Sequence, residues 1–228
     1  MTFSKVWPVI LVLLTGCGGA EASRKSHAAP ASAVWKLENP RTVDGADCEV
    51  LGNPVVKTEN GVTALIFDGK SDGVFVPRNP LIGWQQFTIE VLIKPDGSGD
   101  EAQRFIHIED SAGRRAMVET RVTRDGHWAL DTYLRTDAER NRTLFDFAKL
   151  HATDKWYWVA LVYDGKAMSS YVDGEKELEG PVDFLPMIDG QISVGVRQNR
   201  VYWYKGAISE IRFHPKALRP AELQHAPK

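Results

Sequence analysis

Three neighbouring segments of the sequence, within residues 104–135, carry polar side chains at alternate positions. Apolar residues occupy the positions between them, so each segment is expected to form a β-strand with one buried and one outward face. Short turns separate the segments, which favours three adjacent strands that present their outward residues together. We call this set the polar face. Its expected members are Phe105, His107, Glu109, Met117, Glu119, Arg121, His127, Ala129, Asp131, Tyr133 and Arg135.

The polar face contains residue types that take part in acid–base chemistry. A retaining glycosidase needs two carboxylates about 5.5 Å apart, and a polysaccharide lyase needs a base, an acid and a group that neutralises a uronate. The candidate catalytic residues are Glu109, Glu119 and Asp131 for the first chemistry and His107, Tyr133 and Arg121 for the second. Any antiparallel sheet also presents polar residues to solvent, so a merely solvated surface stays open as an alternative.

The elements that must position these residues are short strands. Period-2 runs bounded by Gly, Asp, Asn and Pro recur along the chain, whereas helical periodicity is restricted to a turn or two near residues 220–223. The expected strands are 87–94, 104–109, 116–122, 127–135, 155–163, 167–172, 191–197 and 207–214. This pattern predicts an all-β antiparallel sandwich of the jelly-roll type, in one domain over residues 34–228.

The N-terminal residues combine a basic residue, an apolar run and a cysteine. Lys5 precedes the run 6–14, which is too short to span a bilayer, since spanning takes about 20 residues. The sequence 14–17, Leu-Thr-Gly-Cys, resembles a bacterial lipobox, which implies cleavage before Cys17 and acylation of that residue. The absence of Asp at residue 18 leans toward the outer membrane. We therefore expect a signal peptide over 1–16, a lipidated Cys17 with a flexible tether over 17–33, and a location in the bacterial cell envelope.

Composition excludes some function classes. The chain has 28 Lys and Arg against 30 Asp and Glu, a net charge of −2, which gives no dominant attraction to nucleic acid. Two cysteines are too few for a disulfide framework, and Cys48 is expected to be buried or half-buried. No cofactor is expected.

Two features of the expected loops stay open. Carboxylates at 68 and 72 and at 96 and 100 could bind a structural calcium, but they lack an EF-hand pattern and fit loop solvation. The aromatic run 202–204 fits either packing at the sandwich edge or a platform for a sugar ring.

Five motifs occur in an order that resembles a known family. They are residues 64–77, 87–95, 155–165, 171–174 and 204–218. Together they resemble the LamG-like domain, a jelly roll of the laminin G and concanavalin A type. The resemblance implies that the first and last strands pair, 34–38 beside 207–213. It also implies that the polar face forms a ligand groove, joined by Trp158. Ser209 stands where many relatives carry Asp, which puts calcium binding in doubt.

These observations favour a membrane-anchored, non-catalytic module that binds a polysaccharide or a surface protein. Aromatic rings stack on sugar faces, while guanidinium and carboxylate groups bind hydroxyls or uronates. The candidate ligand-binding residues are His107, Glu109, Glu119, Arg121, His127, Asp131, Tyr133, Arg135 and Trp158. The alternatives are a lyase or glycoside hydrolase that uses the same face, although the E-x-D-x-E signature of β-glucanases is absent from these strands, and a structural envelope lipoprotein.

Overall fold

A computed structural model describes residues 1–2 and 31–226. The expected lipidation site Cys17, most of the expected signal peptide and most of the tether lie outside these residues. Within the described residues, no helix has the length and apolar character needed to cross a membrane.

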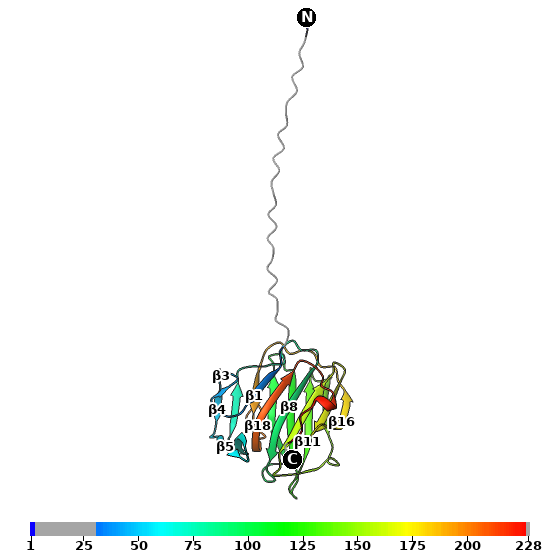
Figure 1. The fold of residues 1–228 in the computed structure, drawn as a ribbon. Coiled ribbons are helices and arrows are strands. Elements are labelled where there is room, and N and C mark those ends of the chain that lie inside the picture. The colour runs from blue at the N-terminus through cyan, green and yellow to red at the C-terminus, as the bar shows by residue number, and fades with distance from the viewer. Residues whose placement is uncertain (3–30, 227–228) are drawn as a thin grey trace.

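The described chain folds into two large antiparallel sheets, shown in Figure 1. Sheet I has the order β16-β15-β14-β8-β18-β6-β5, and β1 also pairs with β18. Its strands are β1 (Ala33–Lys36), β5 (Val55–Glu59), β6 (Val62–Asp68), β8 (Phe87–Pro95), β14 (Tyr157–Tyr163), β15 (Ala167–Val172), β16 (Glu175–Pro181) and β18 (Lys205–His214).

Sheet II has the order β12-β11-β10-β9-β17-β7-β4, and β13 pairs with β11. Its strands are β4 (Glu49–Leu51), β7 (Gly73–Val76), β9 (Ala102–Glu109), β10 (Arg115–Val122), β11 (His127–Arg135), β12 (Asn141–Phe145), β13 (His151–Ala152) and β17 (Gln191–Val194). The remaining elements are the ribbon β2 (Thr42–Val43) and β3 (Ala46–Asp47) and a single 3-10 turn η1 (Pro220–Glu222). The all-β sandwich predicted from the sequence is confirmed.

The core lies between the two sheets and consists of the alternating apolar residues of both. Phe87, Ile89, Val91 and Ile93 from β8 are all fully buried, as the period-2 pattern of that strand predicts. Cys48 is half-buried and packs against the edge of this core. Every strand that the structure describes begins at Ala33 or later, so a fragment of residues 31–228 contains the whole described core.

The first and last strands pair as expected. Antiparallel pairing joins Ala33 to Phe213 and Lys36 to Glu210. The Trp35 side chain is buried, and its ring meets that of Phe213 at 4.8 Å in a T-shaped contact. The first described strand, β1, therefore contributes directly to the core through Trp35.

A tight turn at Asp173 and Gly174 joins strands β15 and β16. Asp173 and Gly174 both adopt positive φ, 47° and 77°, which is the geometry of a two-residue hairpin between β15 and β16. The Asp173 carboxylate accepts the backbone N–H of Trp158 at 2.9 Å. This hairpin is thus fastened to the neighbouring strand β14.

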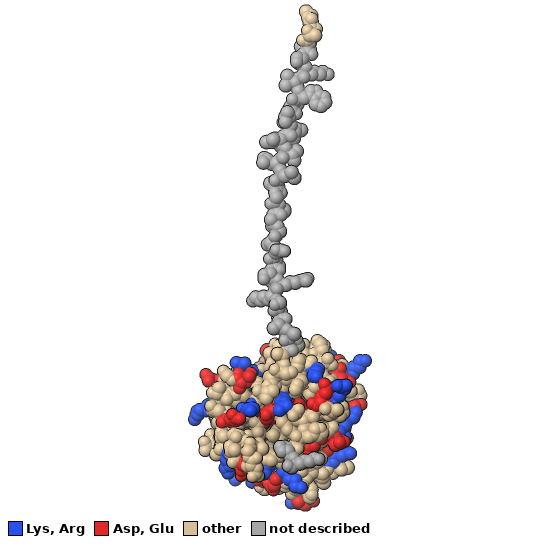
Figure 2. Space-filling model, in the orientation of Figure 1, with Lys and Arg blue, Asp and Glu red and all other residues tan. Residues whose placement is uncertain are grey.

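Charged residues are spread over the visible side of the molecule. Figure 2 shows Lys and Arg interspersed with Asp and Glu there, without a large field of one sign. This distribution agrees with the net charge of −2.

Candidate functional site

Strands β9, β10 and β11 lie side by side in sheet II, as the sequence predicts. The register sets Met117 opposite His107 on one side and opposite Tyr133 on the other. Glu119 stands opposite Asp131 in the same way. The intervening apolar residues of these strands belong to the core between the sheets. Most of the expected polar face is therefore one continuous surface.

The polar face departs from the prediction near the start of β9. The register of β9 on β10 shifts after Val118, so that Glu119 pairs with Arg104 and one residue of β9 is extra. Phe105 consequently turns into the core, where its ring lies 5.4 Å from that of Tyr204. The expectation that Phe105 points outward is wrong, and Arg104 takes its place on the polar face.

Two carboxylates and two guanidinium groups form an ionic cluster at this end of the polar face. The Nε of Arg104 lies 3.0 Å from Oε1 of Glu119. Arg121 donates from its Nε to Oδ2 of Asp131 at 2.7 Å, and its Nη2 lies 3.9 Å from Glu119. Glu119 and Asp131 are only 1% and 2% exposed. Both acids are thus enclosed among their neighbours although they stand on an outer face.

Burial of this cluster changes the ionisation of its acids. Burial, followed by the charge of Asp131, raises the pKa of Glu119 to about 7. Burial also raises the pKa of Asp131, while the hydrogen bond from Arg121 opposes that rise. The two acids face each other, so the charge of Asp131 opposes the ionisation of Glu119.

A second cluster surrounds His107. The backbone N–H of Gln198 donates to Nδ1 of His107 at 3.0 Å, and a nitrogen that accepts cannot carry a proton. The proton of the neutral ring is therefore on Nε2, which lies 3.2 Å from the carboxylate of Glu109. Arg115 binds the other oxygen of Glu109 at 2.8 Å.

This arrangement keeps His107 neutral and Glu109 ionised. Burial lowers the pKa of His107, against the raising effect of Glu109. The hydrogen bond from His107, with further support from Arg115, lowers the pKa of Glu109 to about 2. His107 is only 1% exposed, so its ring supports the sheet rather than facing solvent.

Aromatic rings flank the first cluster on both sides. The guanidinium group of Arg104 lies 3.8 Å from the centre of the Tyr202 ring, and that of Arg121 lies 5.6 Å from the centre of Phe145. Phe145 in turn meets Phe147 at 4.6 Å in a T-shaped contact. Tyr202 and Phe147 are 42% and 44% exposed. The polar face therefore has accessible aromatic rims.

The aromatic run 202–204 serves two purposes. Tyr204 is fully buried in the core, which fits the packing interpretation. Tyr202 instead covers Arg104 at the edge of the polar face, which leaves the platform interpretation open for that ring.

Half-buried side chains make up the accessible part of the polar face. Arg121, Tyr133 and Arg135 all retain exposed surface. Beside Glu109, an open depression of about 570 Å³ continues the surface toward Gln191 and Gln198. This volume lies within the roughly 300–1,000 Å³ of small-molecule sites.

One expected member, Trp158, lies elsewhere, and another, His127, stands at the end of the polar face. Trp158 belongs to β14 in sheet I, where it is buried and has the Arg212 guanidinium 4.9 Å from its ring centre. The expectation that it joins the polar face is wrong, because strand alternation predicts which side a residue takes but not which sheet its strand enters. His127 stands at the far end of β11, beside Asp125, with its ring 3.4 Å from that carboxylate.

The loop carboxylates bind the chain itself. Asp68 accepts the backbone N–H groups of Lys70, Ser71 and Asp72 at 2.8–3.0 Å, which lowers the pKa of Asp68 to about 2 despite the opposing effect of burial. Ser209 donates to the Thr63 carbonyl. Among the described residues, no three His, Cys, Asp or Glu side chains are grouped to hold a metal.

The geometry bears on the catalytic alternatives. Glu119 faces Asp131 across adjacent strands and has the raised pKa that suits a general acid. A general acid must reach the glycosidic oxygen, however, and neither carboxylate offers more than 2% of its residue surface. The accessible groups of the polar face are guanidinium groups, a phenol and aromatic rings, which suit binding.

Residues 68–224 match the model of the family described as the concanavalin A-like lectin/glucanases superfamily. The match covers more than half of the chain and includes all three strands of the polar face. The fold thus defines a two-sheet β-sandwich domain of the concanavalin A-like type. The chain belongs to the concanavalin A-like superfamily, as the resemblance to LamG-like domains implies. No curated protein matches the sequence.

Several solved structures share this fold. Domain 4 of AbnA, an extracellular GH43 arabinanase from Geobacillus stearothermophilus in complex with arabinotriose, has a TM-score of 0.62 at 18% identity, over 83% of this chain and 94% of that domain. The CBM40 of a Ruminococcus gnavus IT-sialidase, bound to α2,3 sialyllactose, has a TM-score of 0.52 at 20% identity, over 76% and 95%.

The binding domain of botulinum neurotoxin DC, in complex with SialylT, has a TM-score of 0.60 at 15% identity. The aligned part is 83% of this chain and 49% of the toxin domain. At such identities these similarities establish a common fold.

Proposed function

We propose that this domain is a non-catalytic carbohydrate-binding module and that the outer face of sheet II binds an acidic glycan. One observation carries the proposal. Arg135 stands opposite Arg115 on the adjacent strand, and among the described residues no carboxylate lies within ion-pair distance of Arg135. Like charges facing each other across strands are unfavourable, and an incoming carboxylate would relieve this one.

The charge balance of the polar face supports an acidic ligand. Four guanidinium groups stand on it against three carboxylates: Arg104, Arg115, Arg121 and Arg135 against Glu109, Glu119 and Asp131. Because the pKa of Glu119 is about 7, that acid is partly protonated at neutral pH and the positive excess increases. A uronate or another acidic sugar fits this surface better than a neutral glycan.

The rings at the rim supply the apolar part of sugar recognition. Tyr133 lies on β11 opposite Met117 of the central strand β10, and Tyr202 and Phe147 border the face. Aromatic surfaces of this kind stack on sugar rings. Solved domains of the same fold have been obtained with arabinotriose and with sialyllactose, which supports carbohydrate as the ligand class.

The sequence of residues 1–17 supports a lipid anchor at Cys17. In this proposal the module is held at the bacterial cell envelope, in the outer membrane, by its acyl chains. The tether of residues 17–33 reaches at most about 60 Å when extended, so the domain would search the layer next to the membrane. Its partner there is a polysaccharide or, in the alternative version, a surface protein.

A polysaccharide and glycan panel tests the proposal. The fragment 31–228 is applied to acidic and neutral glycans with and without calcium, and both binding and products are measured. Binding of an acidic glycan without new reducing ends or unsaturated products is the expected result. Product formation would contradict the non-catalytic function and direct attention to Glu119 and His107. Absence of binding to every glycan would instead favour a protein partner.

Matched variants locate the ligand. Arg135→Ala is expected to weaken acidic-glycan binding about tenfold or more, because a charge-assisted hydrogen bond contributes about 1.5–3 kcal/mol. Tyr133→Ala is expected to weaken it through loss of stacking. Arg142→Ala is the control, since Arg142 is an exposed arginine on β12 that pairs with Leu134 and so has the opposite alternation from Arg135. Equal affinity of all three variants would contradict this site.

A further inference from the structure

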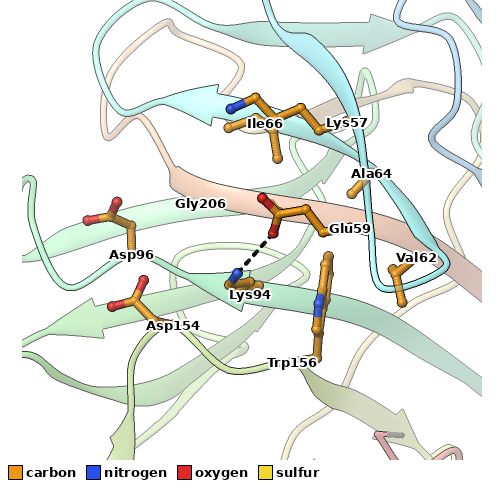
Figure 3. A pocket seen from close by; sticks show the side chains of 11 residues that line it. Lys57, Glu59, Val62, Ala64, Ile66, Lys94, Asp96, Asp154, Trp156 and Gly206 are labelled. Carbon is orange, nitrogen blue, oxygen red and sulfur yellow. Dashed lines mark hydrogen bonds and ion pairs between the residues drawn. The ribbon is translucent and has the colours of Figure 1, made fainter.

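A separate pocket lies on the outer face of sheet I, away from the polar face. It has a volume of about 180 Å³ and is smaller than the depression beside Glu109. Its floor comes from β5, β6, β8 and β18, and its side from the segment that leads into β14. Figure 3 shows this pocket with Trp156 standing on one side and Asp96 and Asp154 on the other.

Small residues create the hollow. Ala64 on β6 and Ala207 on β18 lie on the outward side of the sheet between longer side chains, and Gly206 adjoins them. A Cβ atom at Gly206 would come within 2.5 Å of the Lys94 carbonyl oxygen, and the φ of 141° favours glycine there. Position 206 therefore requires glycine, and the absence of a side chain there helps to keep the pocket open.

Trp156 forms the wall of the pocket. Its side chain is half-buried, so part of its ring stays accessible. In Figure 3 the indole stands edge-on, which turns a ring face toward Lys94 and Asp154. Val62 lies beside the ring, and Ile66 adds apolar surface across the pocket, next to Lys57.

The charges in the pocket nearly cancel. Lys94 forms an ion pair with Glu59 at 3.4 Å, and Asp96 accepts from Ser98 and lies 3.7 Å from Lys205. The other charged lining residues are Lys57 and Asp154. The pocket thus offers both donors and acceptors without a strong preference for an ion of either sign.

We propose that this pocket binds a single neutral sugar ring, stacked on Trp156, with its hydroxyl groups hydrogen-bonded to Asp154 and Lys94. The volume is below the roughly 300–1,000 Å³ of drug-sized sites, so it takes one ring rather than a chain. An aromatic wall with carboxylate and ammonium groups opposite it matches a ring that has an apolar face and polar edges. This site is independent of the acidic-glycan site on sheet II.

The test is a titration of the 31–228 fragment with neutral monosaccharides and trisaccharides of glucose, galactose, xylose and arabinose, followed by saturation-transfer NMR. At least one is expected to bind saturably. Trp156→Ala is expected to reduce the affinity about tenfold or more, and Trp156→Phe is expected to restore part of the loss, because a smaller ring still stacks. No saturable binding of any of these sugars would overturn the proposal.

A second variant guards against a folding defect. Ala64→Leu keeps Trp156 and fills the floor, so it is expected to abolish binding. Because Ala64 is only 1% exposed, the larger side chain should lower the melting temperature, while an unchanged far-UV spectrum would show that the fold is kept. Leu185→Ala, which removes an exposed apolar side chain outside both proposed sites, is the control and is expected to bind normally. Retained binding in both Trp156→Ala and Ala64→Leu would also overturn the proposal.

The two sites can fail separately. Arg135→Ala is expected to lose the acidic glycan and keep the neutral sugar, whereas Trp156→Ala is expected to do the reverse. Loss of both ligands in Arg135→Ala alone would assign the neutral sugar to sheet II and overturn the pocket.

Discussion

Glu119 is an acid enclosed on what should be an open surface. Its long neighbours Arg104 and Arg121 pair with it but also cover it, and Asp131 adds a second negative charge. Removing a carboxylate from water disfavours its charged form, which is why the pKa of Glu119 rises to about 7. The pKa of Glu109 is instead lowered, since hydrogen bonds from His107 and Arg115 favour its charged form.

These opposite shifts predict opposite pH effects on stability. The folded protein holds a proton on Glu119 between about pH 4.5 and 7 while the unfolded chain has released it, so this acid makes the free energy of unfolding fall as pH rises through that window. Glu119→Gln should remove the fall. The free energy of unfolding of the variant minus that of the parent should therefore increase by up to about 3 kcal/mol from pH 5 to pH 8, as measured by denaturant titration.

Glu109→Gln is the matched control on the adjacent strand. The pKa of Glu109 is lowered to about 2, so its contribution to stability is present above about pH 4.5 and is lost as pH falls toward 2. The control should therefore be less stable than the parent at neutral pH and approach it in acid. If both variants shifted stability in the same direction, the ionisation states described here would be wrong.

At the scale of elements, strand alternation predicts most of the polar face. His107, Glu119 and Tyr133 all lie on it, because hydrophobic residues between them need the core. The bulge in β9 was not predictable, since an extra residue in one strand leaves the local pattern unchanged and appears only in the pairing with β10. The sequence therefore assigned Phe105 to the wrong side and missed Arg104.

The inward orientation of Phe105 at the bulge can be tested by measuring the free energy of unfolding of two variants. Phe105→Ala should lower the free energy of unfolding by about 3–5 kcal/mol, because a fully buried ring is removed from the core. Phe147→Ala, which removes an exposed ring of the same type, should change it by no more than about 0.5 kcal/mol. Similar losses in the two variants, measured by urea denaturation, would contradict the inward orientation of Phe105.

Local sequence patterns do not predict contacts between segments that lie far apart in the chain. Tyr202 covers Arg104 and Gln198 binds His107, although each pair is separated by more than 90 residues. Phe145 was missed because nothing in its own segment indicates Arg121 as a neighbour. The pocket beside Trp156 gathers residues from five segments for the same reason. Alternation thus predicts faces, whereas loops and sheet order determine sites.

At the scale of the whole molecule, β1 makes the start of the domain part of its core. Trp35→Ala should cost about 3–5 kcal/mol of stability, because the ring is 1% exposed and contacts Phe213. Val34→Ala on the same strand is the control, since Val34 is half exposed and should matter little. Thermal unfolding of the two variants measures the difference.

The anchor belongs to the same scale. Cys17→Ser should move the protein from the membrane fraction to the soluble fraction, because acylation needs the thiol and each buried CH₂ of an acyl chain contributes about 0.8 kcal/mol of membrane affinity. Melting temperature and glycan binding should be unchanged, since the described core begins at Ala33. A Cys17→Ser protein that stays with membranes would contradict the lipoprotein prediction.

The pairing of β1 with β18 has a mechanical consequence. A load applied at residue 31 along the direction of β1 would act on the pairs from Ala33–Phe213 to Lys36–Glu210 together, in shear, rather than opening them one at a time. The buried Trp35 would have to leave the core in the same event. If the domain is held at its N-terminal end and pulled by a bound polymer, the β1–β18 pairs and the buried Trp35 would resist the force together. Strand β1 would then act as a mechanical clamp.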